Sequence, residues 1–171
     1  SLVPSMDYPG RKTGTRLEKH LYADDTGSFY ENFEKPSWEP DVLAEELPKP
    51  DVVGWLRNLP RKDWSLCIPY TEGDVVKPLY PDFVIFRKVK NKISADSLDP
   101  HSSSYSDAIP KAKGLTVFAE KHGAQFGRIE LIHKVNGKLK RIDLQNEIIR
   151  GKILKATERP HLDRLFDNST E

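Results

Sequence analysis

The first long stretch with a regular apolar pattern runs from residue 38 to residue 59. Its apolar side chains recur at helical spacing, but Pro48 and Pro50 interrupt them. Proline removes a backbone donor and clashes with the preceding turn of a helix. The pattern therefore predicts two short helices separated by a kink.

Three shorter apolar runs follow, at residues 64–70, 75–87 and 93–98. They are rich in β-branched and aromatic residues. A turn at Gly73 and a basic turn at 88–92 join them, as expected for successive β-strands. These strands should form a three-stranded meander.

The second half of the chain begins with a serine-rich loop that ends at Ser106 or Asp107. Either residue can cap a helix that runs to His122 and ends at Gly123. The order of helix, three strands, helix and strand predicts an α/β fold with a mixed β-sheet flanked by helices. The remaining apolar runs predict two strands, at 127–135 and 139–144, and two short helices, at 146–154 and 160–166.

Residues 1–36 lack a periodic pattern. They are polar, with prolines and glycines spaced through them. We expect an irregular N-terminal arm with one short helical turn at 17–22, followed by a single domain at 37–171. A chain of 171 residues is long enough for one globular domain with an adequate core.

Composition excludes several classes of protein. The net charge of +1 provides no overall attraction to nucleic acid or membrane, so any such binding has to come from local clusters. Cys67 is the only cysteine, which excludes an internal disulfide and a cysteine-rich zinc site. No apolar run approaches the roughly 18 residues of a membrane span, and no signal peptide pattern is present. We expect a cytoplasmic protein without a membrane partner.

Two carboxylates interrupt otherwise apolar strands. Asp82 comes directly before the run Phe83–Phe86, and Asp96 lies in the middle of the next apolar run. A charged side chain in such a position costs free energy unless it is paired or binds a ligand. The two acids therefore suggest a metal site for phosphodiester chemistry. For Asp82 the alternative is an edge-strand acid that pairs with Arg57 or Lys77.

The order of these elements, with Pro-Asp-Phe at 81–83 after Trp55-Leu56-Arg57-Asn58 and the segment 64–70, carries a resemblance. It resembles the C-terminal nuclease region of type III restriction enzyme subunits and related DNA helicase-nucleases, within the PD-(D/E)XK superfamily. The resemblance covers residues 38–132. It implies a restriction-endonuclease-like fold and magnesium-dependent cleavage of DNA, with Asp82 and Asp96 at the positions of the two metal-binding acids.

The resemblance also implies a lysine two residues after the second acid, where this chain has Leu98. Some members supply the lysine from the following helix, which makes Lys111 the first candidate and Lys113 the second. The alternative is a site that has lost catalysis. Asp99 and His101 are further candidates for metal binding or proton transfer, or they are ordinary loop residues.

The expected ion is Mg²⁺ or Mn²⁺, because carboxylates without clustered cysteines or paired histidines favour hard cations. Cations near the acidic strands could hold a DNA backbone, although lysine-rich turns are also common as solvated surface. The candidates for this contact are Arg57, Arg61, Lys62, Arg87, Lys88, Lys90 and Lys92.

No G-x-x-x-x-G-K-[ST] phosphate loop is present, so a DNA-translocating ATPase or helicase would be a separate domain or subunit. The expected function is a metal-dependent DNA endonuclease domain of a restriction or phage-defence helicase-nuclease. The alternative is a catalytically degenerate module on the same fold that binds nucleic acid or docks to a partner. Formation of a homodimer is left open.

Overall fold

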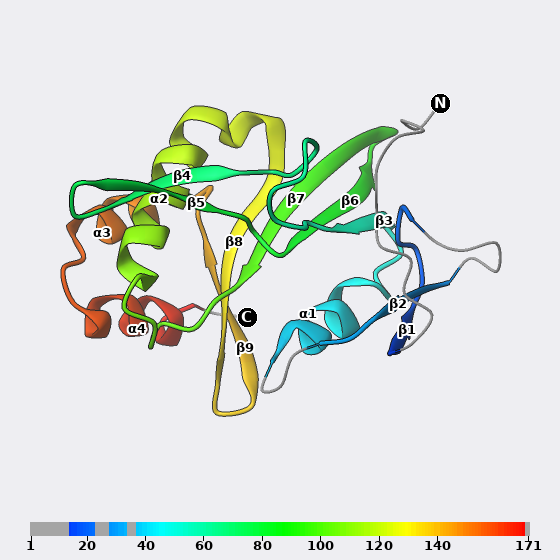
Figure 1. Ribbon diagram of the computed structural model, residues 1–171, viewed down its shortest axis with the longest axis horizontal. Helices are drawn as coiled ribbons and strands as arrows, with labels where there is room; N and C mark the ends of the chain where they lie inside the picture. The colour runs from blue at the N-terminus through cyan, green and yellow to red at the C-terminus, as the bar shows by residue number, and fades with distance from the viewer. Residues whose placement is uncertain (1–13, 23–27, 34–36, 170–171) are drawn as a thin grey trace.

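The computed structural model describes residues 14–22, 28–33 and 37–169 (Figure 1). Five strands form one sheet in the order β3-β6-β7-β8-β9. The β7–β8 pair is parallel because α2 (Ala108–His122) carries the chain back between these strands, and the other pairs are antiparallel. The strands are β3 (Val52–Arg57), β6 (Phe83–Val89), β7 (Lys92–Pro100), β8 (Phe126–Val135) and β9 (Lys138–Asp143).

Helices cover both faces of this sheet, which confirms the predicted α/β class with a mixed sheet flanked by helices. The short helix α1 (Glu39–Glu46) packs on one face, and α2, α3 (Glu147–Lys155) and α4 (Arg159–Asp167) pack on the other. Side chains alternate along each strand, so β8 supplies both cores, with Ile132 on the α1 side and Ile129 and Leu131 on the α2 side. The α1 core includes Leu43, Trp55, Phe83, Ile85 and Leu98, and the α2 core includes Leu115, Ile129, Leu131, Ile142, Ile153 and Phe166.

The predicted three-stranded meander is wrong. The run at 75–87 is two strands, β5 (Val75–Leu79) and β6, and the chain changes sheets between them at Pro81. Proline has no N–H to donate to a ladder, so the break falls there. β5 pairs with β4 (Ile68–Glu72) as a separate hairpin that packs on α2 (Figure 1).

The second predicted helix in 38–59 is also wrong, because this segment forms strand β3. Helix α1 ends at Glu46, before Pro48 and Pro50. The residues that follow, Val52-Val53-Gly54-Trp55, favour an extended backbone, and β6 supplies the hydrogen-bonding partner. Apolar spacing alone could not distinguish a helix from a strand whose pairing partner is distant in the chain.

Part of the N-terminal arm is ordered against the edge of the sheet. Strands β1 (Thr15–Leu17) and β2 (Phe29–Glu31) pair with each other. The amide of Leu21 donates to the Trp55 carbonyl at 2.9 Å, and the amide of Trp55 donates to the Lys19 carbonyl at 3.0 Å. The helical turn predicted at 17–22 is therefore wrong, since this segment covers the edge of β3. The remaining residues of the arm lie outside the described part, and the boundary at residue 36 stays a prediction.

The later elements were predicted correctly in type and place. The helix expected to end at His122, the strands expected at 127–135 and 139–144, and the two terminal helices correspond to α2, β8, β9, α3 and α4. Within the described ranges, no helix combines the length and the apolar character needed to cross a bilayer.

Candidate functional site

Two carboxylates meet where β6 begins and β7 ends. Asp82 occupies the bend before β6, and Asp99 is the penultimate residue of β7. Because Phe83 is paired with Leu98, the next step of the antiparallel register brings Asp82 and Asp99 side by side. The backbone N–H of Asp82 donates to the Asp99 carboxylate. Asp99 is only 5% exposed, whereas the Asp82 side chain keeps 28% of its surface accessible to solvent.

This pair carries more negative charge than its surroundings neutralise. Burial raises the pKa of Asp82 well above its ordinary value, and Asp99 and Glu39 raise it further against the opposing effects of Arg57 and Lys111. Burial also raises the pKa of Asp99 to about 7, although Lys111 and the Asp82 amide act in the opposite direction. Two neighbouring buried carboxyls titrate as a unit. Near neutral pH the pair therefore retains a proton unless a further cation joins it.

A third acid, Glu39, reaches the same place from the first turn of α1. Arg57 holds it: the guanidinium Nη1 lies 2.5 Å from Glu39 Oε2, while Nη2 lies 3.9 Å from Asp82 Oδ1. The Arg57 side chain also stacks over the Phe83 ring at 5.3 Å. Our sequence analysis missed Glu39, because an acidic residue in a first helical turn is a common stabilising feature. The pairing of Asp82 with Arg57, considered there as an alternative, is present, whereas Lys77 pairs with Glu72.

The first turn of α2 brings Lys111 to the acid pair. Its Nζ lies 2.9 Å from Asp107 Oδ2, and its charge acts on both Asp82 and Asp99. Lys113 is two residues further along the helix and therefore points in a different direction. Among the described residues, the charges that act most strongly on the two acids include Lys111 and not Lys113. The structure thus favours Lys111 of the two lysines that we predicted.

His101 follows the pair in the loop after β7. Burial, with a further contribution from Lys111, lowers its pKa to about 4, so the imidazole is neutral at physiological pH. Its Nε2 lies 3.7 Å from Asp107 Oδ1, beyond hydrogen-bonding distance. Within the described part of the chain, His101 Nε2 and Asp99 Oδ2 are buried polar atoms without a hydrogen-bond partner. Such atoms are uncommon in folded proteins, and a bound ion or water is a usual explanation for them.

Asp96 does not belong to this site, so its predicted pairing with Asp82 is wrong. It lies opposite Ile85 in the ladder and therefore faces α1, whereas Asp99, three residues further along β7, faces α2. Asp96 is fully buried and accepts hydrogen bonds from Arg87 Nε at 2.6 Å and Arg128 Nε at 2.8 Å. Its charge is already compensated by the protein.

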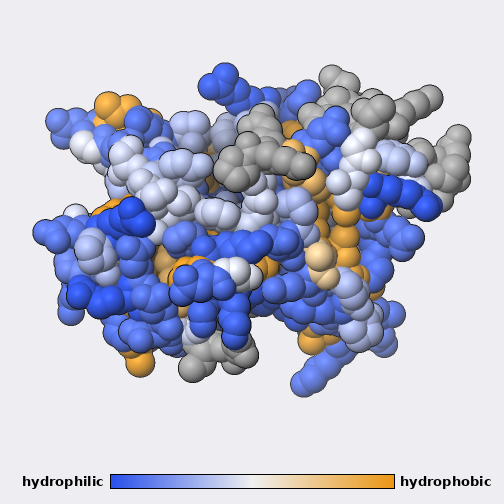
Figure 2. Space-filling model, turned by 90° about the horizontal axis from the view of Figure 1, so that it is seen from below, coloured by the Kyte–Doolittle hydropathy of each residue, from blue (hydrophilic) through white to orange (hydrophobic). Residues whose placement is uncertain are grey.

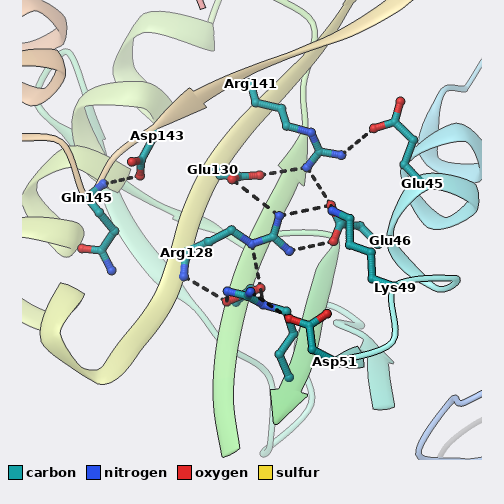
Figure 3. A network of polar contacts seen from close by, with 11 residues as sticks. Glu45, Glu46, Lys49, Asp51, Arg128, Glu130, Arg141, Asp143 and Gln145 are labelled. Atoms are coloured by element: carbon teal, nitrogen blue, oxygen red, sulfur yellow. Dashed lines mark hydrogen bonds and ion pairs between the residues drawn. The ribbon is translucent and has the colours of Figure 1, made fainter. Parts of the chain in front are cut away.

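The partners of Asp96 extend into a network that joins α1 to β8 and β9 (Figure 3). Arg128 donates to both carboxylate oxygens of Glu46, at 3.2 and 2.7 Å, and Arg141 lies 2.9 Å from the same glutamate. Burial alone would raise the pKa of Glu46. Hydrogen bonds from Arg128 and Lys49, together with the charges of Arg128 and Arg141, lower it to about 2 instead. Glu130 completes the network through Arg141 at 2.9 Å. The network is an internal ion cluster that fixes α1 on the sheet.

Most of the cations predicted to hold DNA are not beside the acids. Lys88, Lys90 and Lys92 lie at the far end of the β6–β7 hairpin, separated from Asp82 by most or all of the seven residues of β6, at about 3.4 Å each. Arg87 is occupied by Asp51 and Asp96, and Arg57 by Glu39. The loop that carries Arg61 and Lys62 begins beside the site, where the Asn58 amide donates to the Asp82 carbonyl at 2.9 Å.

The site provides some, but not all, of the ligands that a hard divalent cation requires. Asp82 and Asp99 offer carboxylate oxygens, which Mg²⁺ and Mn²⁺ prefer, and one Asp99 oxygen lacks a hydrogen-bond partner in the described structure. However, no group of three or more histidine, cysteine or acidic side chains within the described ranges is arranged as a metal site. Full coordination would therefore require water or substrate oxygens in addition to the two aspartates, as is common for Mg²⁺.

Comparison with known proteins places the chain in a family. The sequence model of the YagJ family matches residues 18–171. Protein YagJ from Escherichia coli (strain K12) is 33% identical over 138 residues, which cover 80% of this chain and 56% of that relative, so the chain spans about half the relative's length. No solved structure matches. These descriptions name no activity and make no connection with restriction enzymes or nucleases. The chain belongs to the YagJ family.

Proposed function

We propose that this chain is a metal-dependent DNA endonuclease domain in which Asp82 and Asp99 bind Mg²⁺ or Mn²⁺. One observation carries the proposal: two adjacent carboxyls have pKa values raised by burial, and an Asp99 oxygen is buried without a hydrogen-bond partner in the described structure. A divalent cation would remove this electrostatic penalty. Raised pKa values combined with a cation, Lys111, beside the acids are typical of functional sites.

The change of acid from Asp96 to Asp99 also changes how the sequence compares with the PD-(D/E)XK pattern. Counted from Asp99, the position two residues on is His101 rather than Leu98. Leu98 is fully buried in the α1 core and cannot act on a substrate. His101 is neutral and its Nε2 is unpartnered among the described residues, so in the tautomer with Nε2 unprotonated it can accept a proton from water.

Each residue of the site has a distinct role in this proposal. The bound ion would supply Lewis-acid activation of water and of the phosphate. Lys111 provides positive charge where negative charge develops on the phosphate, and Arg57 holds Glu39 near Asp82. Arg61 and Lys62, in the loop that begins beside Asp82 at Asn58, are the candidate contacts to the DNA backbone.

The wider setting belongs to the same proposal. We infer a cytoplasmic domain that acts on DNA together with a DNA-translocating ATPase or helicase in a restriction or phage-defence system. A homodimer would place two such sites on one duplex. Neither the motor nor the dimer is needed for the test of the acid pair.

A second candidate function is a non-catalytic module that binds nucleic acid or docks to a partner. It is favoured by the ion pairs that already occupy the cations of the site, Arg57 with Glu39 and Lys111 with Asp107. If these pairs persist when substrate binds, Lys111 is not available to a phosphate. This function would retain binding to DNA without cleavage.

The test is cleavage of supercoiled plasmid and single-stranded DNA by the purified chain in Mg²⁺, in Mn²⁺ and in EDTA. We expect cleavage that depends on the divalent ion and is lost in Asp82→Asn and in Asp99→Asn. Lys111→Ala should lower the rate by about 10²-fold or more, while Lys113→Ala should leave it within about twofold. Binding to DNA without cleavage under any ion would support the second candidate, and equal loss in Lys113→Ala would exclude the assigned role of Lys111.

A further inference from the structure

A cavity of about 380 Å³ lies between α3 and α4, apart from the acid pair. Ala156 and Leu165, both nearly inaccessible to solvent, contribute its apolar part. The cavity is within the size range of small-ligand sites. Lys152 and Lys155 from α3, His161 and Arg164 from α4, and Asn168 after α4 provide its polar lining.

The charged side chains that line this cavity are all basic. Its lining includes two lysines and an arginine but no acidic residue. In the described structure, Lys152, Lys155 and Arg164 take part in no ion pair, in contrast to Arg57 or Arg128. Unpaired cations around a hollow leave a positive potential that attracts an anion.

His161 adds a hydrogen-bond donor to the same place. Its Nδ1 accepts the backbone N–H groups of Thr157, at 3.2 Å, and Glu158, at 3.4 Å. An imidazole that accepts at Nδ1 carries its proton on Nε2. His161 lines the cavity, so this second nitrogen is available as a donor to a ligand there.

The stabilisation of helix ends explains the position of each cation along its own helix, but not why the two helices bring these cations to one cavity. Lys152 and Lys155 lie in the last turn of α3, where positive charge interacts favourably with the helix dipole. Arg164 lies in the last turn of α4 and interacts in the same way with the dipole of that helix. Cations from two helices therefore meet around one cavity. Figure 2 shows that the side of the molecule carrying these helices is mainly hydrophilic, with isolated apolar atoms.

We propose that the α3–α4 cavity binds a phosphate group, either a phosphodiester of nucleic acid or the phosphate monoester of a nucleotide. Arg164 supplies the planar donor pair that matches phosphate oxygens, and Lys152 and Lys155 supply compact positive charges. The His161 Nε2–H and the Asn168 amide complete the set of donors. The proposal does not depend on the nuclease, because no residue of the acid pair takes part.

The test measures binding by the full chain in EDTA, where no metal-dependent cleavage occurs. Fluorescence anisotropy of a labelled oligonucleotide and thermal stabilisation by adenosine monophosphate distinguish the two sources of phosphate. The test variants are Lys155→Glu with Arg164→Glu, and Arg164→Gln as a milder change. Lys121→Glu, an exposed lysine in the last turn of α2, is the control for general charge.

For nucleic acid, we expect the double variant to weaken oligonucleotide binding by about tenfold or more, Arg164→Gln to have a smaller effect, and Lys121→Glu to stay within about twofold. For a nucleotide, only the stabilisation by adenosine monophosphate should be lost. Unchanged binding of both probes in the double variant, or an equal loss in Lys121→Glu, would overturn the proposal. Asp99→Asn should bind both probes normally, so failure of the nuclease proposal is distinguishable from failure of this one.

Discussion

Replacement of Asp99 by asparagine should stabilise the metal-free protein above neutral pH. Asparagine keeps the shape of the side chain and can still accept the N–H of Asp82, but it removes one charge from the buried pair. The wild-type protein tolerates that charge at a cost in stability, which is a common feature of functional sites. If Asp99 were a structural carboxylate with satisfied hydrogen-bond partners, its replacement by asparagine would lower the stability of the protein.

The magnitude follows from the pKa of Asp99, which rises from 3.8 to about 7 on folding. Between these pH values the folded state keeps a proton that the unfolded chain has released, so the free energy of unfolding falls as pH rises. The decrease in the free energy of unfolding is complete once the pH exceeds the pKa of Asp99 in the folded state. At 1.36 kcal/mol per pK unit, the difference between the two pKa values corresponds to a loss of about 4 kcal/mol in the free energy of unfolding. Asp99→Asn should lack this loss.

The assay is urea denaturation of both proteins in EDTA at a series of pH values from about 4 to about 8. The two stabilities should be similar at the acid end and diverge toward the alkaline end, with the variant more stable. Addition of Mg²⁺ or Mn²⁺ should stabilise the wild type at the alkaline end and leave the variant unchanged.

Asp96→Asn is the matched control, because it removes a carboxylate that Arg87 and Arg128 already compensate. It should lower stability across the whole pH series without changing the effect of metal. If Asp99→Asn also lowers stability at the alkaline end, Asp99 is a satisfied structural acid, and the reasoning that assigns the pair to a metal is refuted.

Other predictions concern the packing around the site. Arg128→Ala leaves buried carboxylates without their partner and should cost about 3–5 kcal/mol in urea denaturation, whereas Lys134→Ala, which removes an exposed ion pair, should cost less than about 1 kcal/mol. Gly114→Ala would place a methyl group 3.0 Å from Tyr70 Cα and should cost about 1–3 kcal/mol by thermal or urea unfolding. Gly151→Ala on α3, where a methyl group meets nothing within 4 Å, should stabilise by about 0.5–1 kcal/mol, and a loss there would contradict the packing described for α3.

The sequence by itself determined the features that depend on local pattern. Helix α2 and strand β8 follow from apolar spacing, and α2 ends at the predicted glycine; its predicted cap is not formed, because the Asp107 side chain makes no cap hydrogen bond and pairs with Lys111 instead. Asp82 could be recognised as unusual for the same reason, because a carboxylate beside an apolar strand is visible without knowledge of its partner.

Only the tertiary structure decided which acid accompanies Asp82. Asp96 and Asp99 are close in sequence, but the alternation of side chains puts them on opposite faces of β7, and the register with β6 selects Asp99. The same holds for Glu39, which reaches the site only because α1 packs on the sheet. Strand β3 has a spacing that also suits a helix, and its partner on β6 decides the outcome. Strand pairing, and the side of the sheet that a residue occupies, depend on segments that are distant in the chain. A local sequence pattern therefore cannot determine them.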